Sequence, residues 1–226
     1  MTTRKLDFPT ILASSVHDMK NSLSMLLQLI ERLTEQVNQP DVANDLAHLH
    51  YETQRINMGL IQLLALYRHD ADSLPLAMEE NFADELIEDV LAQNEVYIQQ
   101  RQLTVTTDIE PDLAAYFDRD LIYTLVNDIV VNAMRYAADK LHIVAKKADK
   151  GLTIEIHDDG PGYPENMLQS SIQPLGELDL TAARTGLGLF FAQLIASVHQ
   201  RDDVSGKILL ENNGCFGGSL FRLTLP

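Results

Sequence analysis

The most informative stretch of the sequence is DIVVNAMRY, residues 128–136. Its apolar residues recur at helical spacing, within a helix that we expect from about residue 119 to residue 138. Asp128, Asn132 and Arg135 stand at i, i+4 and i+7, so they share a polar edge of an otherwise apolar helix. An amide oxygen at Asn132 could ligate a Mg²⁺ ion carried by a nucleotide, because this ion takes oxygen ligands and prefers phosphate partners. Taken alone, the pattern is that of a helix with one polar side.

Segments of helix and strand alternate around this stretch. Helical spacing predicts further helices over residues 82–101 and 187–199. Alternation of apolar and polar residues predicts strands over 103–109, 141–145, 152–156, 207–211 and 219–225. This order predicts an α+β fold in which helices cover one sheet.

Two glycine-containing stretches follow the helix in sequence. DDGPG, residues 158–162, comes at the end of an expected strand, and RTGLGL, residues 184–189, opens an expected helix. A carboxylate beside glycines allows a flat base to approach the backbone closely. Backbone N–H groups at the start of a helix can bind phosphate. Each stretch alone is a weak signal, but their order after the asparagine helix is a much stronger one.

The first third of the chain carries two helical patterns. Apolar residues recur at helical spacing from about residue 8 to 37, and again to about residue 67 after the break NQPD at residues 38–41. The two apolar faces exceed what a hairpin can hide, so we expect a dimer with four helices crossing at about +20°. A two-helix flap on a larger domain is the alternative. The polar segment RHDADSLP, residues 68–75, is typical of a linker.

The first of these helices contains HDMKN, residues 17–21. His17 and Asn21 are one turn apart and share a face. An imidazole can accept a phosphoryl group, and a neighbouring carboxylate such as Asp18 would hold its tautomer and stabilise the imidazolium.

Composition excludes several other classes of protein. The chain has 226 residues, with 17 Lys and Arg against 33 Asp and Glu, for a net charge of −16. Nucleic-acid binding depends on basic residues and is therefore not expected. The single cysteine, Cys215, excludes an intrachain disulfide and suits a reducing compartment. No apolar run approaches the ~20 residues of a membrane span, and we expect a cytoplasmic protein.

Taken together, these stretches resemble the transmitter region of sensor histidine kinases of two-component signalling, over nearly the whole chain. Residues 17–21 resemble the H box, 132–136 the N box, 158–162 and 186–188 the two glycine boxes, and Gly217-Gly218 the final turn. The resemblance implies a helical hairpin that forms a dimeric four-helix bundle for dimerisation and phosphotransfer, followed by a Bergerat-type α/β sandwich that binds ATP. The domains would be residues 1–70, a linker at 71–80, and residues 81–226.

The resemblance also implies roles for single residues. His17, with Asp18 beside it, would take the γ-phosphoryl group of ATP and pass it to an aspartate in the receiver domain of a response regulator. Asn21 would position water for dephosphorylation of that regulator. Asp158 would accept from the adenine amino group, and Asn132 and Asp128 would hold Mg²⁺. The remaining ATP-binding residues would be Arg135, Tyr136, Gly160, Gly162, Thr185, Gly186, Leu187 and Gly188.

The sequence departs from the family's pattern at several positions. Asp128 replaces the first asparagine of the N box, Ser22 a common proline, and Arg184 a glycine. The lid between Tyr163 and Thr185 is short, and its phenylalanine-rich box is reduced to residues 172–175. Three alternatives therefore stay open: a phosphotransfer or scaffold protein with a decayed ATP site, a homologue in which phosphatase activity dominates, and a chaperone-like or serine-kinase relative. Seven residues before Phe8 cannot form a sensing domain, so we expect input from a separate protein or from a ligand on the bundle.

Overall fold

The computed structural model divides into two compact units, Met1–Pro75 and Leu76–Pro226. In the second unit it describes residues 76–148, 151–172 and 186–226. In the first unit it describes residues 18–19, 21–23, 25–30, 32–34, 37, 39, 42, 45–46, 49–50, 52–53, 56 and 59.

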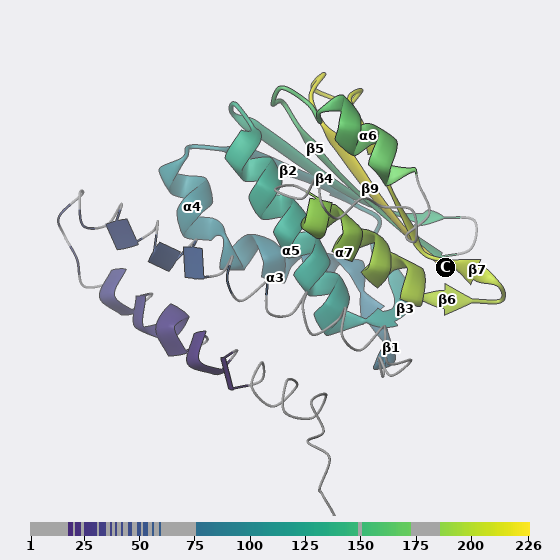
Figure 1. Ribbon diagram of the computed structural model, residues 1–226, viewed down its shortest axis with the longest axis horizontal. Coiled ribbons are helices and arrows are strands. Elements are labelled where there is room, and N and C mark those ends of the chain that lie inside the picture. The colour runs from purple at the N-terminus through teal and green to yellow at the C-terminus, as the bar shows by residue number, and fades with distance from the viewer. Residues whose placement is uncertain are drawn as a thin grey trace, which may run out of the picture. The chain divides into compact units, whose positions relative to one another are not determined.

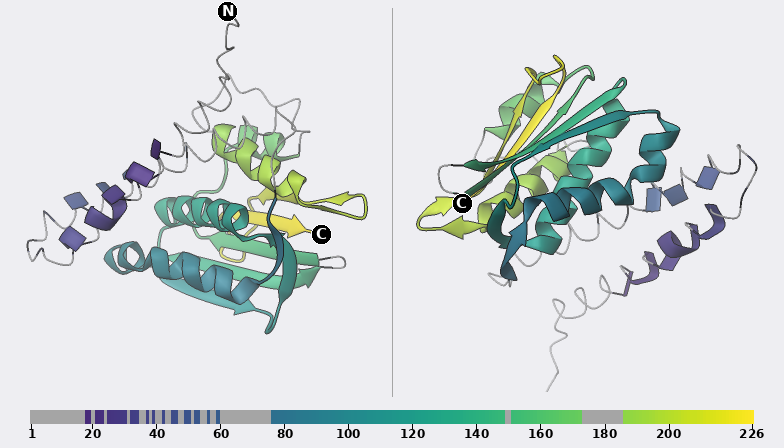
Figure 2. Two further views of the ribbon diagram at one scale, coloured as in Figure 1. Left: turned by 90° about the horizontal axis from the view of Figure 1, so that it is seen from below. Right: turned by 180° about the vertical axis from the view of Figure 1, so that it is seen from behind.

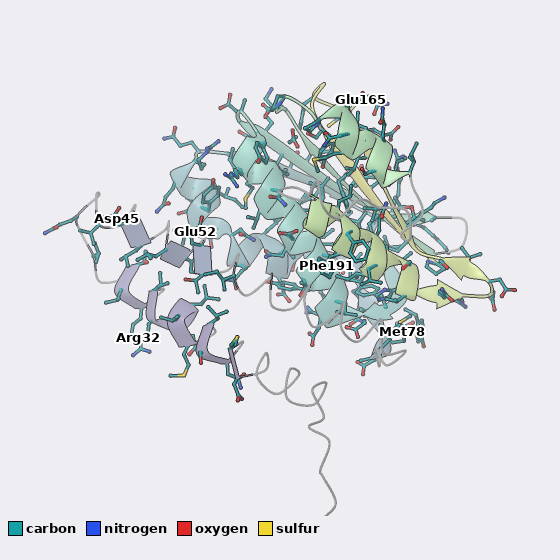
Figure 3. All side chains as sticks on the ribbon, viewed as in Figure 1. Arg32, Asp45, Glu52, Met78, Glu165 and Phe191 are labelled. Atoms are coloured by element: carbon teal, nitrogen blue, oxygen red, sulfur yellow. The ribbon has the colours of Figure 1, made fainter. Side chains whose placement is uncertain are left out.

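Every residue that the structure describes between positions 18 and 34, and between positions 42 and 59, is helical, in agreement with two predicted helices (Figure 1). Polar side chains such as Arg32 and Asp45 project from these helical residues (Figure 3). Large apolar side chains are also exposed, by 38–66%, at Met19, Met25, Leu26, Leu29, Leu33, Val42, Leu49 and Ile56. The described part of this unit therefore presents considerable apolar surface to solvent.

The second unit is built on a mixed five-stranded sheet. Its strands are β2 (Thr104–Ile109), β4 (Lys140–Ala148), β5 (Gly151–Asp158), β9 (Leu220–Leu225) and β8 (Lys207–Glu211), adjacent in that order. Strands β2 and β4 are parallel, and every other neighbouring pair is antiparallel. Two small antiparallel ribbons are added, one from β1 (Met78–Phe82) and β3 (Ala114–Asp118), the other from β6 (Gln200–Arg201) and β7 (Val204–Ser205).

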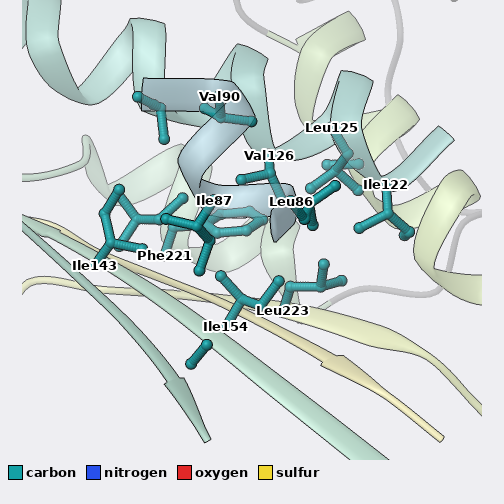
Figure 4. Packing of buried hydrophobic residues seen from close by; sticks show 14 of the residues in the cluster. Leu86, Ile87, Val90, Ile122, Leu125, Val126, Ile143, Ile154, Phe221 and Leu223 are labelled. Atoms are coloured by element: carbon teal, nitrogen blue, oxygen red, sulfur yellow. The ribbon is translucent and has the colours of Figure 1, made fainter. Parts of the chain in front are cut away.

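Helices cover one face of this sheet (Figure 2). They are α3 (Ala83–Gln93), α4 (Glu95–Gln100), α5 (Arg119–Tyr136), α6 (Glu165–Ser171) and α7 (Gly186–Val198). The core lies between α3, α5, α7 and the sheet, where side chains such as Ile87 and Val126 meet Ile154 and Phe221 (Figure 4). Each of these four is at most 2% exposed, and full burial of such a side chain contributes about 1.5–3 kcal/mol. The unit is therefore a two-layer α/β sandwich.

The opposite face of the sheet is polar but charge-compensated. Glu155 of β5 lies 3.1 Å from Nζ of Lys146 and 2.7 Å from Nε of Arg222. Burial alone would raise the pKa of Glu155, but the hydrogen bonds and charges of Arg222 and Lys146 outweigh it and lower the pKa. A buried carboxylate can therefore remain ionised in the middle of the sheet.

Most of the elements predicted for this unit are confirmed, and one is corrected. The predicted helix over residues 82–101 is wrong at its start and its middle, because Phe82 ends β1 and Asn94 separates α3 from α4. Asn94 is buried and its Nδ2 donates to the carbonyl of Val90 at 2.7 Å and to Oδ1 of Asn127 at 2.8 Å. Local side-chain hydrogen bonds of this kind compete with the helix ladder. The short elements β1, β3, α6, β6 and β7 were not predicted.

His199, just after α7, gives a prediction about stability. It is 0% exposed, its Nε2 accepts from the backbone N–H of Asp118 at 3.0 Å, and its Nδ1 lies 2.7 Å from the carbonyl oxygen of Ile195. Burial lowers the pKa of His199, although the Ile195 carbonyl and the charge of Asp118 oppose this shift. As the pH falls below about 6.5, the unfolded chain protonates this histidine, whereas folded His199, with its lowered pKa, stays neutral to lower pH. The contribution of neutral His199 to stability is therefore lost as the pH falls below that value.

The test compares urea unfolding of the wild type and His199→Phe at pH 7.5 and 5.5. At pH 7.5 we expect the variant to lose about 1–3 kcal/mol, because the Asp118 N–H is left without its acceptor. On going from pH 7.5 to pH 5.5, we expect the free energy of unfolding to fall less in the variant than in the wild type. The wild type and the variant are compared because Asp128 also titrates in this pH range. Burial raises the pKa of Asp128 to about 6, so its protonation favours the folded state as the pH falls, in both proteins. Equal losses in both proteins would contradict the prediction.

Candidate nucleotide-binding site

The site begins at Asp158, the last residue of β5, which is 3% exposed. Its Oδ1 accepts from the backbone N–H of Gly160 at 2.8 Å and of Ser219 at 3.3 Å. Its own N–H donates to the carbonyl of Ser219 at 3.1 Å. These bonds hold the carboxylate in one orientation at the end of the strand.

Two glycines allow the backbone to close around this carboxylate. A Cβ on Gly160 would lie 2.6 Å from the carbonyl oxygen of Tyr136, and a Cβ on Gly218 would lie 2.5 Å from that of Asp158. Both distances are shorter than side-chain carbons tolerate. Glycine at these positions therefore brings the C-terminal end of α5 against Asp158.

The segment after the first glycine box is fixed by a residue that the sequence analysis did not identify. Oδ1 of Asn212 accepts from the N–H of Tyr163 at 2.6 Å, and Nδ2 of Asn212 donates to the Tyr163 carbonyl at 2.9 Å. Gly162 adopts φ +86°, a left-handed conformation that favours glycine. Burial and the nearby charge of Asp158 raise the pKa of Tyr163 well above its usual range, so its hydroxyl stays neutral.

Asp159 joins the glycine box to the end of α5. Its Oδ1 accepts from the backbone N–H groups of Ala138 at 2.9 Å, Asp139 at 3.1 Å and Lys140 at 3.1 Å. Partial burial raises the pKa of Asp159, but these backbone hydrogen bonds outweigh it and lower the pKa. In the sequence Asp159 stands out only as part of the motif, because its partners come close to it only in the folded chain.

The polar edge of α5 is present as predicted. Asn132, Arg135 and Tyr136 are exposed, and the guanidinium carbon of Arg135 lies 5.5 Å from the centroid of the Tyr136 ring. Asp128 is partly buried, and burial raises the pKa of its carboxyl to about 6. Asp118 caps the helix by accepting from the N–H of Leu121 at 3.1 Å, which fixes where α5 begins.

The first turn of α7 lies beside this edge. A Cβ on Gly188 would lie 3.7 Å from Oδ2 of Asp128, an ordinary contact distance. Gly186 and Leu187 belong to the same helical turn. The structure thus forms two separate clusters along α5. One contains Tyr136, Gly160 and Asp158, and the other contains Asp128 and Gly188.

Of the three residues predicted for the phosphotransfer site, the structure describes two. Asp18 and Asn21 are helical and exposed in the first unit. His17 lies outside the described residues, as does Thr185 of the predicted ATP site. The roles predicted for these residues stay predictions.

The described residues contain no group of three or more His, Cys, Asp and Glu side chains that could hold a metal ion. Within the same residues, no helix is both long enough and apolar enough to cross a membrane.

The crowding at Gly218 gives a second prediction. Gly218→Ala places a Cβ within 2.5–2.8 Å of three backbone atoms of Asp158 and Gly160, so the chain must move. We expect a loss of at least about 2 kcal/mol in the free energy of unfolding, measured with urea. Gly217→Ala is the matched control, because its φ of +84° is strained but nothing lies within 4 Å of the added carbon. That variant should lose only about 1 kcal/mol, and equal losses would show that crowding is unimportant.

Comparison with known proteins agrees with this geometry. Residues 117–226 match the family described as histidine kinase-, DNA gyrase B- and HSP90-like ATPases. The chain is 23% identical over 219 residues to the sensor histidine kinase CssS of Bacillus subtilis, covering 96% of this chain and 46% of CssS. It is 24% identical to the sensor-like histidine kinase SenX3 of Mycolicibacterium smegmatis, covering 100% of this chain and 58% of SenX3. The chain thus spans about half the length of these relatives.

Solved structures show the same fold. The Acinetobacter baumannii histidine kinase AdeS superposes with a TM-score of 0.60 at 23% identity, covering 91% of this chain and 95% of that one. The catalytic domain of the histidine kinase ThkA gives 0.55 at 24% identity, covering 66% and 95%. Residues 117–226 thus match the family of histidine kinase-, DNA gyrase B- and HSP90-like ATPases, and the curated proteins that the chain resembles along nearly its whole length are sensor histidine kinases.

Proposed function

We propose that this chain is an ATP-dependent protein-histidine kinase that autophosphorylates on His17 and transfers the phosphoryl group to an aspartate of a response regulator. The observation that carries the proposal is the fixed carboxylate of Asp158, packed through Gly160 against the end of α5. A buried acceptor at the end of a strand, beside glycines, is suited to bind a flat base. Family membership of residues 117–226 supports ATP as that ligand.

The base and the phosphates would bind at opposite ends of the polar edge of α5. Oδ1 of Asp158 is occupied by backbone donors, so Oδ2 is the oxygen proposed to accept from the adenine amino group. Tyr136 would pack near the base. The phosphates would be bound at the first turn of α7, whose N–H groups favour anions, and Arg135 would extend toward them from its position beside Tyr136. ShkA, crystallised with AMPPNP, has the same fold at 15% identity and a TM-score of 0.60.

Asn132 and Asp128 would hold Mg²⁺. Their side chains offer an amide and a carboxylate oxygen one helical turn apart, which are ligands that this ion accepts together with phosphate oxygens. When bound, the ion supplies charge neutralisation at the phosphates. The residues present therefore fit the ion.

The first unit would supply the nucleophile and the dimer contact. We assign residues 1–70 to a hairpin that pairs into a dimeric four-helix bundle, 71–80 to a linker, and 81–226 to the ATP-binding domain. The exposed apolar side chains of the described helical residues support pairing with a second copy. His17 would attack the γ-phosphorus, the bond to the β–γ bridging oxygen would break, and ADP would leave. Asn21 would position water when the regulator is dephosphorylated.

Partner and location are part of the same proposal. A receiver domain is the expected acceptor, since the relatives are sensor histidine kinases. ATP use and a single exposed cysteine support action in the cytoplasm. A separate input protein stays a prediction. The relatives are longer than the part that matches this chain, so the match does not test where the input comes from.

The direct test is incubation of the purified chain with γ-labelled ATP and Mg²⁺. We expect label on the protein that is labile in acid and stable in alkali, as a phosphoramidate is. A folded protein that binds Mg-ATP but takes up no label would contradict kinase activity. A folded protein that shows no nucleotide-dependent thermal shift would contradict ATP binding itself.

A further inference from the structure

The strand β2 forms one edge of the five-stranded sheet, and among the described residues no strand pairs with its outer side. The N–H of Thr104 donates at 2.8 Å to the carbonyl of Asp139, just before β4. Because backbone groups alternate in direction along a strand, the N–H and C=O groups of Val105 and Thr107 point away from β4. An edge of this kind can pair with the strand of another chain.

The sequence of β2 does little to protect this edge. Sheet edges are commonly protected by lysine, by proline or by a β-bulge that turns the strand away. β2, TVTTDI at residues 104–109, contains neither lysine nor proline, and its one charged residue is Asp108. It pairs with β4 in continuous register, so no bulge interrupts it. Its β-branched residues favour further pairing, and the edge is left accessible to a partner.

An open groove of about 360 Å³ lies beside this edge, between β2 and the helices α3 and α4. Its lining residues are Leu91, Ala92, Glu95, Ile98, Val105 and Thr107. The side chains of Leu91, Ile98 and Val105 are half-buried and pack against the core, so they give the groove an apolar floor. A strand added beside Val105 and Thr107 would direct every second side chain into the groove. Edge and groove therefore form one binding surface.

The charges around the groove are mainly those of carboxylates. Glu95 lines the groove, Glu88 is exposed on α3 one turn before the groove residues of that helix, and Asp108 is exposed on β2. Arg101, between α4 and β2, donates to the carbonyl of Ala137 at 3.1 Å. A segment that carries lysine or arginine would complement these carboxylates, whereas a second copy of β2 would bring like charges together.

We propose that this surface binds an extended segment of a partner protein, which adds to β2 as a further strand. The segment places an apolar side chain in the groove and lysine or arginine side chains beside the carboxylates. Backbone hydrogen bonds along the edge supply affinity, and the groove and its charges supply specificity. None of the groove residues belongs to the proposed ATP site, so the inference does not depend on the proposed function.

The probe is a fluorescein-labelled synthetic peptide of about seven residues in which valine alternates with lysine. Its binding to the full chain is measured by fluorescence anisotropy, and we expect it to saturate. Methylation of all backbone nitrogens of the peptide removes its hydrogen-bond donors and should weaken binding by at least about tenfold. A peptide in which glutamate replaces lysine should also bind at least about tenfold more weakly.

Two variants test the edge and the groove separately. Thr107→Pro removes an N–H that points away from β4, so it should spare the sheet and weaken peptide binding by at least about tenfold. Ala92→Phe fills the groove from an exposed helical position and should cause a similar loss. Thermal unfolding checks that each variant is folded, and Ala92→Phe carries the test if Thr107→Pro is not.

Glu95→Gln tests the charge of the groove and should weaken binding of the lysine peptide by about threefold at low salt. Glu165→Gln is the matched control. Both glutamates are exposed helical residues whose Oε1 accepts from a glutamine one turn later, Gln99 at 2.9 Å and Gln169 at 3.1 Å. Glu165 lies on α6, which contacts β8 at the other edge of the sheet. Its variant should bind the peptide as the wild type does.

Several outcomes would overturn the inference. They are a wild type that does not bind the peptide, equal binding of the methylated peptide, and wild-type affinity in a folded Ala92→Phe. Equal weakening in Glu95→Gln and Glu165→Gln would show that the net charge of the chain, and not the groove, attracts the probe. A dimer that dissociates in Thr107→Pro, seen by sedimentation, would show that the edge pairs with a second copy instead of a partner segment.

Discussion

Replacing His17 with glutamine is expected to abolish transfer of label from γ-labelled ATP to the chain, a loss of at least about 1,000-fold in the initial rate. Glutamine retains polarity and similar length but has no nucleophilic nitrogen, since its amide lone pair is delocalised. The phosphoryl group then has no acceptor at this position. Nucleotide affinity should be unchanged, because the predicted ATP site lies in the second unit. Autoradiography of the labelled protein and calorimetry with Mg-ADP measure the two quantities.

His50→Gln is the matched control. His50 is a helical residue of the first unit that is not assigned to the reaction. Its variant should therefore take up label at close to the wild-type rate. Label that persists in His17→Gln and survives acid would point to a hydroxyl acceptor, and thus to the serine-kinase alternative. Loss of label in both variants would indicate damage to the helical unit rather than loss of the nucleophile.

The sheet and its covering helices could be predicted because each element carries its own period. In β5, Leu152, Ile154 and Ile156 face the core at every second position, and α5 presents apolar residues at helical spacing. The break between α3 and α4 could not be predicted, because it depends on Asn94, whose partner Asn127 is 33 residues away. From sequence alone, Asn94 is merely a polar residue within a helical pattern.

The candidate site divides in the same way. Asp158, Gly160 and Asn132 could be proposed as candidate site residues from the sequence, because each stands in a short motif. Asn212 could not be identified, because its amide bonds to the backbone of Tyr163, 49 residues away, and backbone groups carry no sequence signal. The contact between Asp128 and the first turn of α7 likewise appears only when the chain is folded. Sequence therefore indicates candidate ligand-binding residues more readily than the residues that hold them in place.

Replacing Asp158 with asparagine is expected to weaken Mg-ADP binding by about 100-fold or more, measured by calorimetry. The two backbone N–H groups of Gly160 and Ser219 bind Oδ1 and would orient the asparagine amide with its oxygen toward them. The NH₂ group would then take the place of Oδ2. A donor would face the adenine amino group, itself a donor, and both would lose hydrogen bonds in a buried site.

Asp159→Asn removes the same charge one residue further along and separates adenine recognition from general effects of charge. Its amide oxygen can still accept from Ala138 and Lys140, so we expect about 1 kcal/mol of lost stability and a change in affinity of less than about threefold. Wild-type affinity in Asp158→Asn would show that the adenine ring is held elsewhere. No rotation of that amide restores an acceptor at the position of Oδ2 without releasing the N–H groups of Gly160 and Ser219.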